Sequence, residues 1–198
     1  MSTSPIKSRG RALRAFVRRH RRLLVFAAKM AAAYAAWFAL YDLWLAPDGR
    51  LDAWLAGHTA TLCADLLAAV GFETVADGRV FGLAGAPGLR VTDGCNGLSV
   101  FGLFAGFVLA YPGSAARRAG FIPLGVLAIY VVNVGRLVTL AAVQRHWPTA
   151  FDVMHDVAIT SFLYLVVFGL WMAWAHVGGT PAAEREDAFE QGEPASHA

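Results

Sequence analysis

Three residues that lie far apart in the chain have side chains that could perform chemistry together: Cys95, Arg136 and His155. A cysteine sulfur is a nucleophile, a histidine exchanges protons near neutral pH, and an arginine stabilises negative charge. Together they suffice for thiol-dependent acyl transfer: the sulfur attacks a peptide carbonyl, the imidazole protonates the leaving amine, and the guanidinium stabilises the thiolate or the tetrahedral oxyanion. The elements that carry these residues decide whether they can meet.

The first of them, Cys95, lies in the run DGCNG (residues 93–97), where a polar segment changes into an apolar one. We predict that a helix begins directly after the cysteine, so that the N–H groups of its first turn face the sulfur and could receive an oxyanion. Asn96 and Gly97 are expected to support the site, and the glycine permits close backbone approach. Two alternatives stay open, namely a small apolar cysteine near a helix end and a disulfide with Cys63.

The second, Arg136, interrupts an apolar stretch, and Asn133 precedes it by three residues. Placing an arginine inside a membrane helix costs about 2.5–3.5 kcal/mol on the lenient insertion scale, so such residues are functional candidates. Residues three apart lie on one helical face, which predicts a polar stripe formed by Asn133 and Arg136 and makes Asn133 a supporting residue. The alternative is an arginine that extends to the lipid headgroups.

The third, His155, directly follows the run FDVM (residues 151–154) and precedes the last apolar stretch. His146 in the same predicted loop competes with it for a catalytic role. Asp152 or Asp156 could orient the imidazole, although Asp156 is equally suited to cap the helix that follows. An ordinary interfacial histidine is the simpler alternative.

The composition indicates that lipid surrounds much of this 198-residue chain. Hydrophobic residues make up 57% and charged residues 16%, and the mean hydropathy is +0.50, an apolar excess that is unusual for soluble domains. The net charge of +3 does not indicate nucleic-acid binding, because eight of the 17 lysines and arginines lie between Lys7 and Arg22, where they suit an anionic membrane surface. The two cysteines lack metal-ligand spacing, and we expect neither a metal ion nor an organic cofactor.

Four apolar stretches approach the roughly 20 residues that a membrane span requires. They are residues 23–45, 96–111, 120–143 and 157–177. The first is too long for a signal peptide and lacks a clear small-residue cleavage site, so we interpret it as a retained anchor. The second is marginal in length. We therefore predict an all-α integral membrane protein with about four transmembrane helices.

The distribution of positive charge predicts the orientation, because cytoplasmic loops collect lysine and arginine. These residues concentrate in the N-terminal arm (1–22) and in a short loop (112–119), which are both expected in the cytoplasm. Counting the crossings also places the tail (178–198) inside, and its Ala, Glu, Pro and Gly content predicts disorder. Segments 46–95 and 144–155 then lie outside, which brings Cys95 and His155 to the outer face of the membrane. Arg136 lies about 16 residues into the third stretch, which at roughly 1.5 Å per residue places it near the same face.

The longer outer segment is expected to hold an amphipathic helix and a small β-hairpin. Apolar residues recur at helical spacing over residues 51–70 beside Asp52 and other polar residues, which is typical of a helix lying on or against the membrane. A fifth span at this place is the alternative, which the polar stripe disfavours. Two glycine-containing turns, at residues 77–78 and 85–88, lie between short β-prone stretches and predict the hairpin.

Three short motifs resemble those of the exosortase/archaeosortase family of membrane cysteine transpeptidases. They are CNGL at residues 95–98, NVGR at residues 133–136, and the histidine of FDVMH, His155. The similarity covers about residues 50–175, and it implies that residues 23–177 form a compact, membrane-embedded catalytic domain. In that family the matching cysteine, arginine and histidine are taken to form the catalytic triad, so the resemblance assigns these roles to Cys95, Arg136 and His155.

The resemblance further implies a protease or transpeptidase at the outer face of the bacterial inner membrane, which cleaves the C-terminal sorting signals of exported proteins through a thioester on Cys95. Its partners would be substrate proteins that end in a short motif, a transmembrane helix and a basic cluster. The alternative function is a non-enzymatic membrane assembly component or a small transport component. Transport predicts polar residues or broken helices at the midplane of the membrane, and the predicted spans lack them.

Overall fold

The computed structural model describes residues 16–153, 155 and 159–178. Most of the expected basic arm and nearly all of the expected disordered tail, residues 1–15 and 179–198, lie outside these described residues. The fold is mainly helical with one small antiparallel sheet, which confirms the predicted fold class. In chain order the elements are α2 (Arg21–Leu40), the π-helical turn η1 (Tyr41–Leu45), α3 (Ala46–Asp48), α4 (Arg50–Ala69), β1 (Thr74–Asp77), β2 (Val80–Leu83), β3 (Leu89–Arg90), α5 (Leu98–Ala110), α6 (Ala115–His146), the 3-10 turn η2 (Pro148–Ala150), α7 (Phe151–Val153) and α8 (Ile159–Gly178).

Three helices among the described residues are long and apolar enough to cross a membrane. They are Arg21–Asp48, which joins α2 to α3, Ala115–His146 and Ser161–Gly178. The expected second span is instead a shorter apolar helix, α5, of 13 residues. At about 1.5 Å per residue α5 is roughly 20 Å long, against a hydrocarbon core of about 30 Å. The helix begins at Leu98 because the preceding residues form the loop that carries Cys95.

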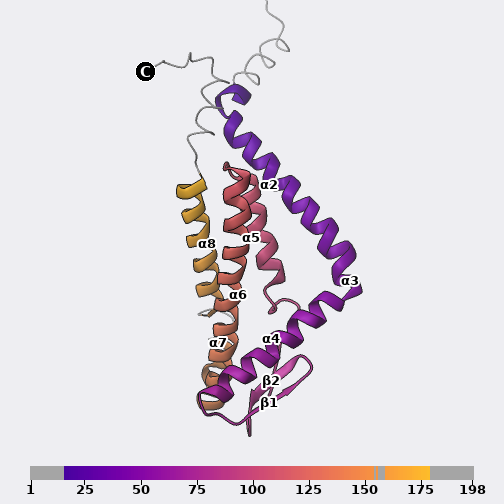
Figure 1. Cartoon of the computed structure of the whole chain (residues 1–198), viewed down its shortest axis with the longest axis vertical. Helices are drawn as coiled ribbons and strands as arrows, with labels where there is room; N and C mark the ends of the chain where they lie inside the picture. The colour runs from indigo at the N-terminus through magenta and orange to yellow at the C-terminus, as the bar shows by residue number, and fades with distance from the viewer. Residues whose placement is uncertain (1–15, 154, 156–158, 179–198) are drawn as a thin grey trace, which may run out of the picture.

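Helices α5, α6 and α8 pack around a shared apolar core, and α2 contacts α5 (Figure 1). Phe104 of α5, Ile129 of α6 and Trp174 of α8 are fully buried there. Small residues allow the close approach: a Cβ at Gly125 of α6 would lie 2.2 Å from the Phe104 ring. Close packing at small residues is the usual way in which helices associate in lipid, because the lipid tails are as apolar as the side chains and no hydrophobic force drives the helices together.

Helix α4 and the sheet form a second cluster at one end of the bundle, against the last half of α6 (Figure 1). The chain passes from α3 to α4 through Gly49, whose φ of 66° bends the path of the backbone between the two helices. The buried face of α4 consists largely of small residues such as Ala56, Ala60 and Cys63. Leu67 is buried with them, whereas Trp54, Leu62 and Leu66 point away from the protein, with Trp54 59% exposed. This arrangement suits the expected helix on the membrane, where lipid covers the exposed apolar face.

The expected β-hairpin is present and is extended by a third strand. Strands β1 and β2 pair in antiparallel register with Asp77 opposite Val80, so that Gly78 and Arg79 form the turn. Strand β3 adds to β2 with Val80 opposite Arg90. Because β3 has only two residues, it carries no alternating pattern from which a sequence could predict it. It brings the chain back across β2 and directs residues 91–97 toward α6.

Candidate active site

Cys95 lies in a tight loop at the start of α5. Its backbone N–H donates to the carbonyl oxygen of Thr92 at 2.8 Å, which closes a four-residue turn. The next side chain, Asn96, accepts a hydrogen bond from the N–H of Leu98 at 2.9 Å and so satisfies one free donor of the helix start. Gly97 has a φ of 88°, and a Cβ there would lie 3.1 Å from the Phe101 ring. The sequence of this loop therefore determines where α5 begins.

The loop is held from α6 by the two residues of the predicted polar stripe. Asn133 is fully buried and donates through Nδ2 to the carbonyl oxygen of Cys95 at 2.8 Å. Arg136 is 8% exposed, and its Nη1 lies 3.5 Å from Oδ1 of Asn133. Its Nη2 lies 4.0 Å from Sγ of Cys95. The guanidinium group is thus buried beside the sulfur and does not extend to the headgroups.

His155 lies two residues after the end of the short helix α7, which packs against α6. Its side chain is half-buried, and its ring stacks on Phe151 with 5.8 Å between centroids. In Figure 1, α7 lies beside α6, and α5 and α8 both begin near this level. The structure therefore brings Cys95 and Arg136 together, whereas a contact between His155 and Cys95 stays a prediction.

The competing histidine, His146, lies at the C-terminal end of α6 and is exposed. It follows Arg136 by ten residues, which places it about 15 Å further along the helix axis. Its ring instead neighbours those of Phe72 and Trp147. The Asp152 side chain and the whole of Asp156 lie outside the described part of the chain, so an orienting carboxylate stays a prediction.

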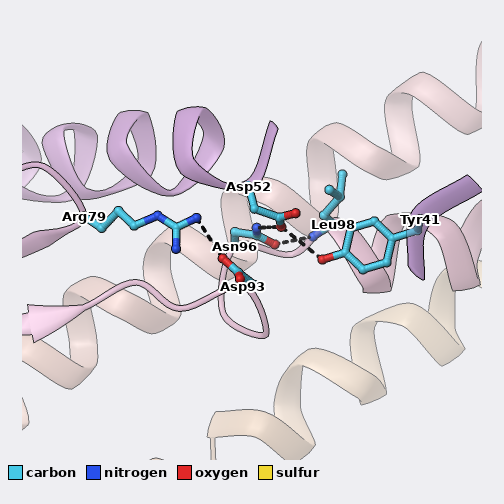
Figure 2. A network of polar contacts seen from close by, with 6 residues as sticks. All are labelled: Tyr41, Asp52, Arg79, Asp93, Asn96 and Leu98. Atoms are coloured by element: carbon cyan, nitrogen blue, oxygen red, sulfur yellow. Dashed lines mark hydrogen bonds and ion pairs between the residues drawn. The ribbon is translucent and has the colours of Figure 1, made fainter. Parts of the chain in front are cut away.

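Sequence reasoning missed a buried carboxylate next to this loop. Asp52 of α4 is 1% exposed, and its Oδ1 accepts a hydrogen bond from the Tyr41 hydroxyl at 3.0 Å and from Asn96 Nδ2 at 2.5 Å (Figure 2). The helical period of α4 groups Asp52 with polar residues that were expected to face solvent. Only the packing of α4 against the loop turns this residue inward.

An ion pair holds the same loop from the sheet. Arg79, in the turn between β1 and β2, lies 2.8 Å from the carboxylate of Asp93 (Figure 2). Asp93 is part of the turn that ends at Cys95. Because Asp93 is 59% exposed in its side chain, the pair contributes little to stability, but it restricts the direction of the loop.

The second cysteine, Cys63, is fully buried in the cluster between α4, the sheet and α6. Both cysteines are free, so the structure does not contain the disulfide that the sequence left open. Burial raises the pKa of the Cys63 thiol to about 12. A thiol in this state is a poor nucleophile, because the thiolate is the reactive form. Among the described residues, no three His, Cys, Asp or Glu side chains are grouped so that they could hold a metal ion.

Comparison with known proteins found one family model, that of the transmembrane exosortases, which matches residues 16–174. The match covers well over half of the chain and includes the loop of Cys95, all of α6 and His155. The search among curated proteins and the search among solved structures each found no match.

Proposed function

Since the chain belongs to the transmembrane exosortase family, whose members are membrane proteins that process C-terminal sorting signals, we propose that it is a cysteine protease or transpeptidase acting through a thioester on Cys95. In this proposal Cys95 is the nucleophile, Arg136 stabilises negative charge, and His155 transfers protons. Asn96, Gly97 and Asn133 support the site by holding the cysteine loop.

The observation that carries the proposal is the buried guanidinium of Arg136 at 4.0 Å from the Cys95 sulfur. At this separation and an effective dielectric of about 20, two unit charges interact by about 4 kcal/mol before desolvation opposes it. The cation therefore stabilises negative charge on sulfur or on a nearby oxygen. Burying an arginine is costly, and stabilising the negative charge that develops in acyl transfer gives this buried cation a function.

The reaction proceeds in two steps. In the first, Sγ of Cys95 bonds to the carbonyl carbon of the scissile peptide, the C–N bond breaks, and His155 gives a proton to the leaving amine. Arg136 and the N–H groups at the start of α5 stabilise the tetrahedral oxyanion. In the second step water or an amine attacks the thioester carbon, His155 takes the proton that the nucleophile loses, and the C–S bond breaks so that the sulfur leaves as a thiolate. Water as the acceptor makes the enzyme a protease, whereas an amine makes it a transpeptidase.

A groove between α2 and α5 supports a substrate with an apolar helix. The cavity there has a volume of about 290 Å³ and is lined by Tyr34, Trp37 and Tyr41 on one side and by Ser99 and Gly106 on the other, among others. Its Tyr41 end adjoins the hydrogen-bonded residues of the Cys95 loop. This cavity is large enough for a few side chains of a substrate helix that lies against α2 and α5, and a helix at that place would present the preceding sorting motif to the sulfur. A basic cluster would then follow at the opposite end of the bundle.

The proposed topology follows the positive charge. Arg117 and Arg118 lie at the end of the bundle where α5 and α8 terminate, and their guanidinium groups donate to the carbonyls of Val177 and Tyr111 at 2.5 and 3.1 Å. We assign this end to the cytoplasm and the Cys95 end to the outer face, with residues 23–177 as the catalytic domain and both termini inside.

The test is C-terminal trimming of a tagged candidate substrate from the same genome, co-expressed with wild-type protein or with Cys95→Ala, Arg136→Ala or His155→Ala. Each of the three variants is expected to lose trimming, by at least roughly a thousandfold for Cys95→Ala. Cys63→Ala is the matched control, because it removes the other thiol without touching the loop, and it should keep trimming. In wild-type protein, mass spectrometry should detect substrate that is bound to the Cys95 peptide and released by hydroxylamine. His155→Ala should accumulate none, because the leaving amine lacks its proton donor.

Trimming that continues normally in Cys95→Ala would overturn the nucleophile assignment and favour the non-enzymatic assembly component. Trimming that survives His155→Ala but is lost in His146→Ala would move the proton-transfer role to the other histidine.

A further inference from the structure

Asp52 lies where the turn after α2, helix α4 and the start of α5 meet. Its side chain is buried, although aspartates are rarely fully buried without a positively charged partner. Its Oδ1 receives both the Tyr41 hydroxyl, from the turn after α2, and the Asn96 amide, from the start of α5 (Figure 2). Within the described part of the chain, its second oxygen, Oδ2, has no hydrogen-bond partner although it is shielded from solvent. A buried acceptor without a partner costs about 1–3 kcal/mol, and more when it is charged.

The contacts of Asp52 lead to the reactive sulfur in two steps. Asn96 donates a hydrogen bond from Nδ2 to Asp52 and accepts one at Oδ1 from the N–H of Leu98. One side chain therefore connects the Asp52 carboxylate to the first turn of α5. Cys95 precedes Asn96, and its carbonyl oxygen is held from the other side by Asn133. The peptide between Cys95 and Asn96 is thereby clamped between α4 and α6.

We propose that Asp52 is a positioning residue for the Cys95 nucleophile: its carboxylate fixes the Asn96 side chain, which sets the start of α5 and the direction of the Cys95 side chain toward Arg136. The carboxylate does not touch the reacting atoms. Tyr41 completes the arrangement by donating to the same oxygen, which ties the groove side of α2 to the loop. This inference rests on the proposed function of Cys95.

The competing explanation is that Asp52 only stabilises the fold. A second polar contact of α4 provides the control that distinguishes a positioning role from a structural one. Thr59, seven residues further along α4, is fully buried and lies 3.3 Å from the Tyr130 hydroxyl of α6. It also ties α4 to the bundle through a polar group, but its hydroxyl bonds to α6 and not to the Cys95 loop. Loss of the Thr59 contact should weaken the fold and leave the sulfur in place.

The experiment exchanges the two side chains of the Asp52–Asn96 pair. Asn96→Asp alone faces one carboxylate with another at hydrogen-bond distance, and it is expected to reduce trimming at least roughly tenfold. In the double variant Asp52→Asn/Asn96→Asp, the new Asn amide donates one N–H to the new carboxylate, which still accepts from the Leu98 N–H. The second N–H of the amide faces the Tyr41 oxygen, which accepts where it donated before. Trimming should return to within roughly threefold of wild type, because residues in direct contact show such coupling.

Alkylation of Cys95 provides a readout that needs no substrate. All variants carry Cys63→Ala, so that Cys95 is the sole thiol, and the rate is measured with a small neutral maleimide in detergent-solubilised protein. Asn96→Asp should shift this rate by at least roughly threefold, and the double variant should restore it. Thr59→Val should lower the thermal unfolding temperature and leave the rate unchanged. If Asn96→Asp does not accumulate, Asp52→Ala replaces it, and both the rate and trimming must depart from wild type.

Three results would overturn the proposal: a double variant as impaired as Asn96→Asp, wild-type alkylation in Asp52→Ala, or a Thr59→Val variant that shifts the alkylation rate as much as Asp52→Ala does. A failure of the proposed function looks different. In that case substrate trimming does not depend on Cys95 at all, whereas the alkylation rates still report whether Asp52 positions the sulfur.

Discussion

The two cysteines show how strongly local environment separates residues of the same type. Cys95 is half-buried in a polar loop beside a guanidinium, whereas Cys63 packs among the alanines and leucines of an apolar cluster. Burial without a compensating charge disfavours the thiolate of Cys63. The sulfur of Cys63 lies 4.0 Å from the carbonyl oxygen of Val134, and only the protonated thiol can donate to that oxygen.

This difference predicts selective alkylation. At pH 8 a thiol with a pKa of about 12 is ionised in roughly one molecule in ten thousand, so native protein should react with maleimide at Cys95 only. Raising the pH to about 9 still leaves Cys63 far below its pKa and should not expose it to reaction. Mass spectrometry should find one label in native protein and two after denaturation in detergent at high temperature. Native labelling that persists in Cys95→Ser would contradict this prediction.

At the scale of the elements, neighbouring helices pack closely where an aromatic ring of one helix lies against a glycine of the other. Gly125 brings α6 against Phe104 of α5, and Gly102 brings α5 against Trp37 of α2. Gly120, on the same helix as Gly125, is exposed, and a methyl group added to it would meet no other side chain within 4 Å. Gly120 and Gly125 therefore differ in packing although both lie within one apolar helix.

Gly125→Ala is expected to destabilise the bundle by about 1–3 kcal/mol, because the new methyl overlaps the fully buried Phe104 ring and forces α5 and α6 apart. Gly120→Ala is the matched control and should leave stability unchanged or slightly raised, since alanine favours the helix by up to about 1 kcal/mol. The measurement is the apparent unfolding temperature in detergent, compared at equal protein and lipid concentration. Equal effects of both substitutions would mean that packing at Phe104 does not govern the stability of the bundle.

At the scale of the whole molecule, two ends of the bundle differ in what they carry. One end has α4, the sheet and the Cys95 loop, and the other has the ends of α5 and α8 with Arg117 and Arg118 (Figure 1). Because α5 is roughly 20 Å long, the Cys95 loop reaches into the outer part of the hydrocarbon layer when the arginine end lies at the inner boundary. Irregular backbone at that depth is tolerated where protein covers it, as α4 and α6 do here.

The orientation is tested by labelling single cysteines in intact cells, in a background with Cys63→Ala and Cys95→Ser. Ala84→Cys, exposed after β2, should react with a membrane-impermeant maleimide, and Ala116→Cys, exposed at the start of α6, should react only after permeabilisation. Both must label in permeabilised cells, which controls for accessibility. Labelling of Ala116→Cys alone in intact cells would reverse the proposed topology.

Much of this architecture could be predicted from the sequence because lipid imposes simple requirements. The apolar stretches had to become helices, since backbone groups find no partners in the hydrocarbon layer, and three of the four expected spans have the necessary length. The run DGCNG also determines the local structure at the start of α5. The side chain of Asn96 accepts a hydrogen bond from the first N–H of the helix, and Gly97 adopts the positive φ that precedes it. The proximity of Asn133 and Arg136 followed from helical spacing.

What only the tertiary structure decided is which face of α4 meets the protein. Periodicity groups residues on a face, but in a membrane the exposed face can be apolar. Trp54, Leu62 and Leu66 of α4 therefore point outward, and a mainly small set of residues packs inward. Asp52 consequently turns toward the Cys95 loop and not toward water. Likewise, the meeting of Arg136 with Cys95 depends on contacts between residues 41 positions apart. Such long-range packing leaves no periodic trace along the chain, because it arises from the shapes of helices that the sequence specifies one at a time.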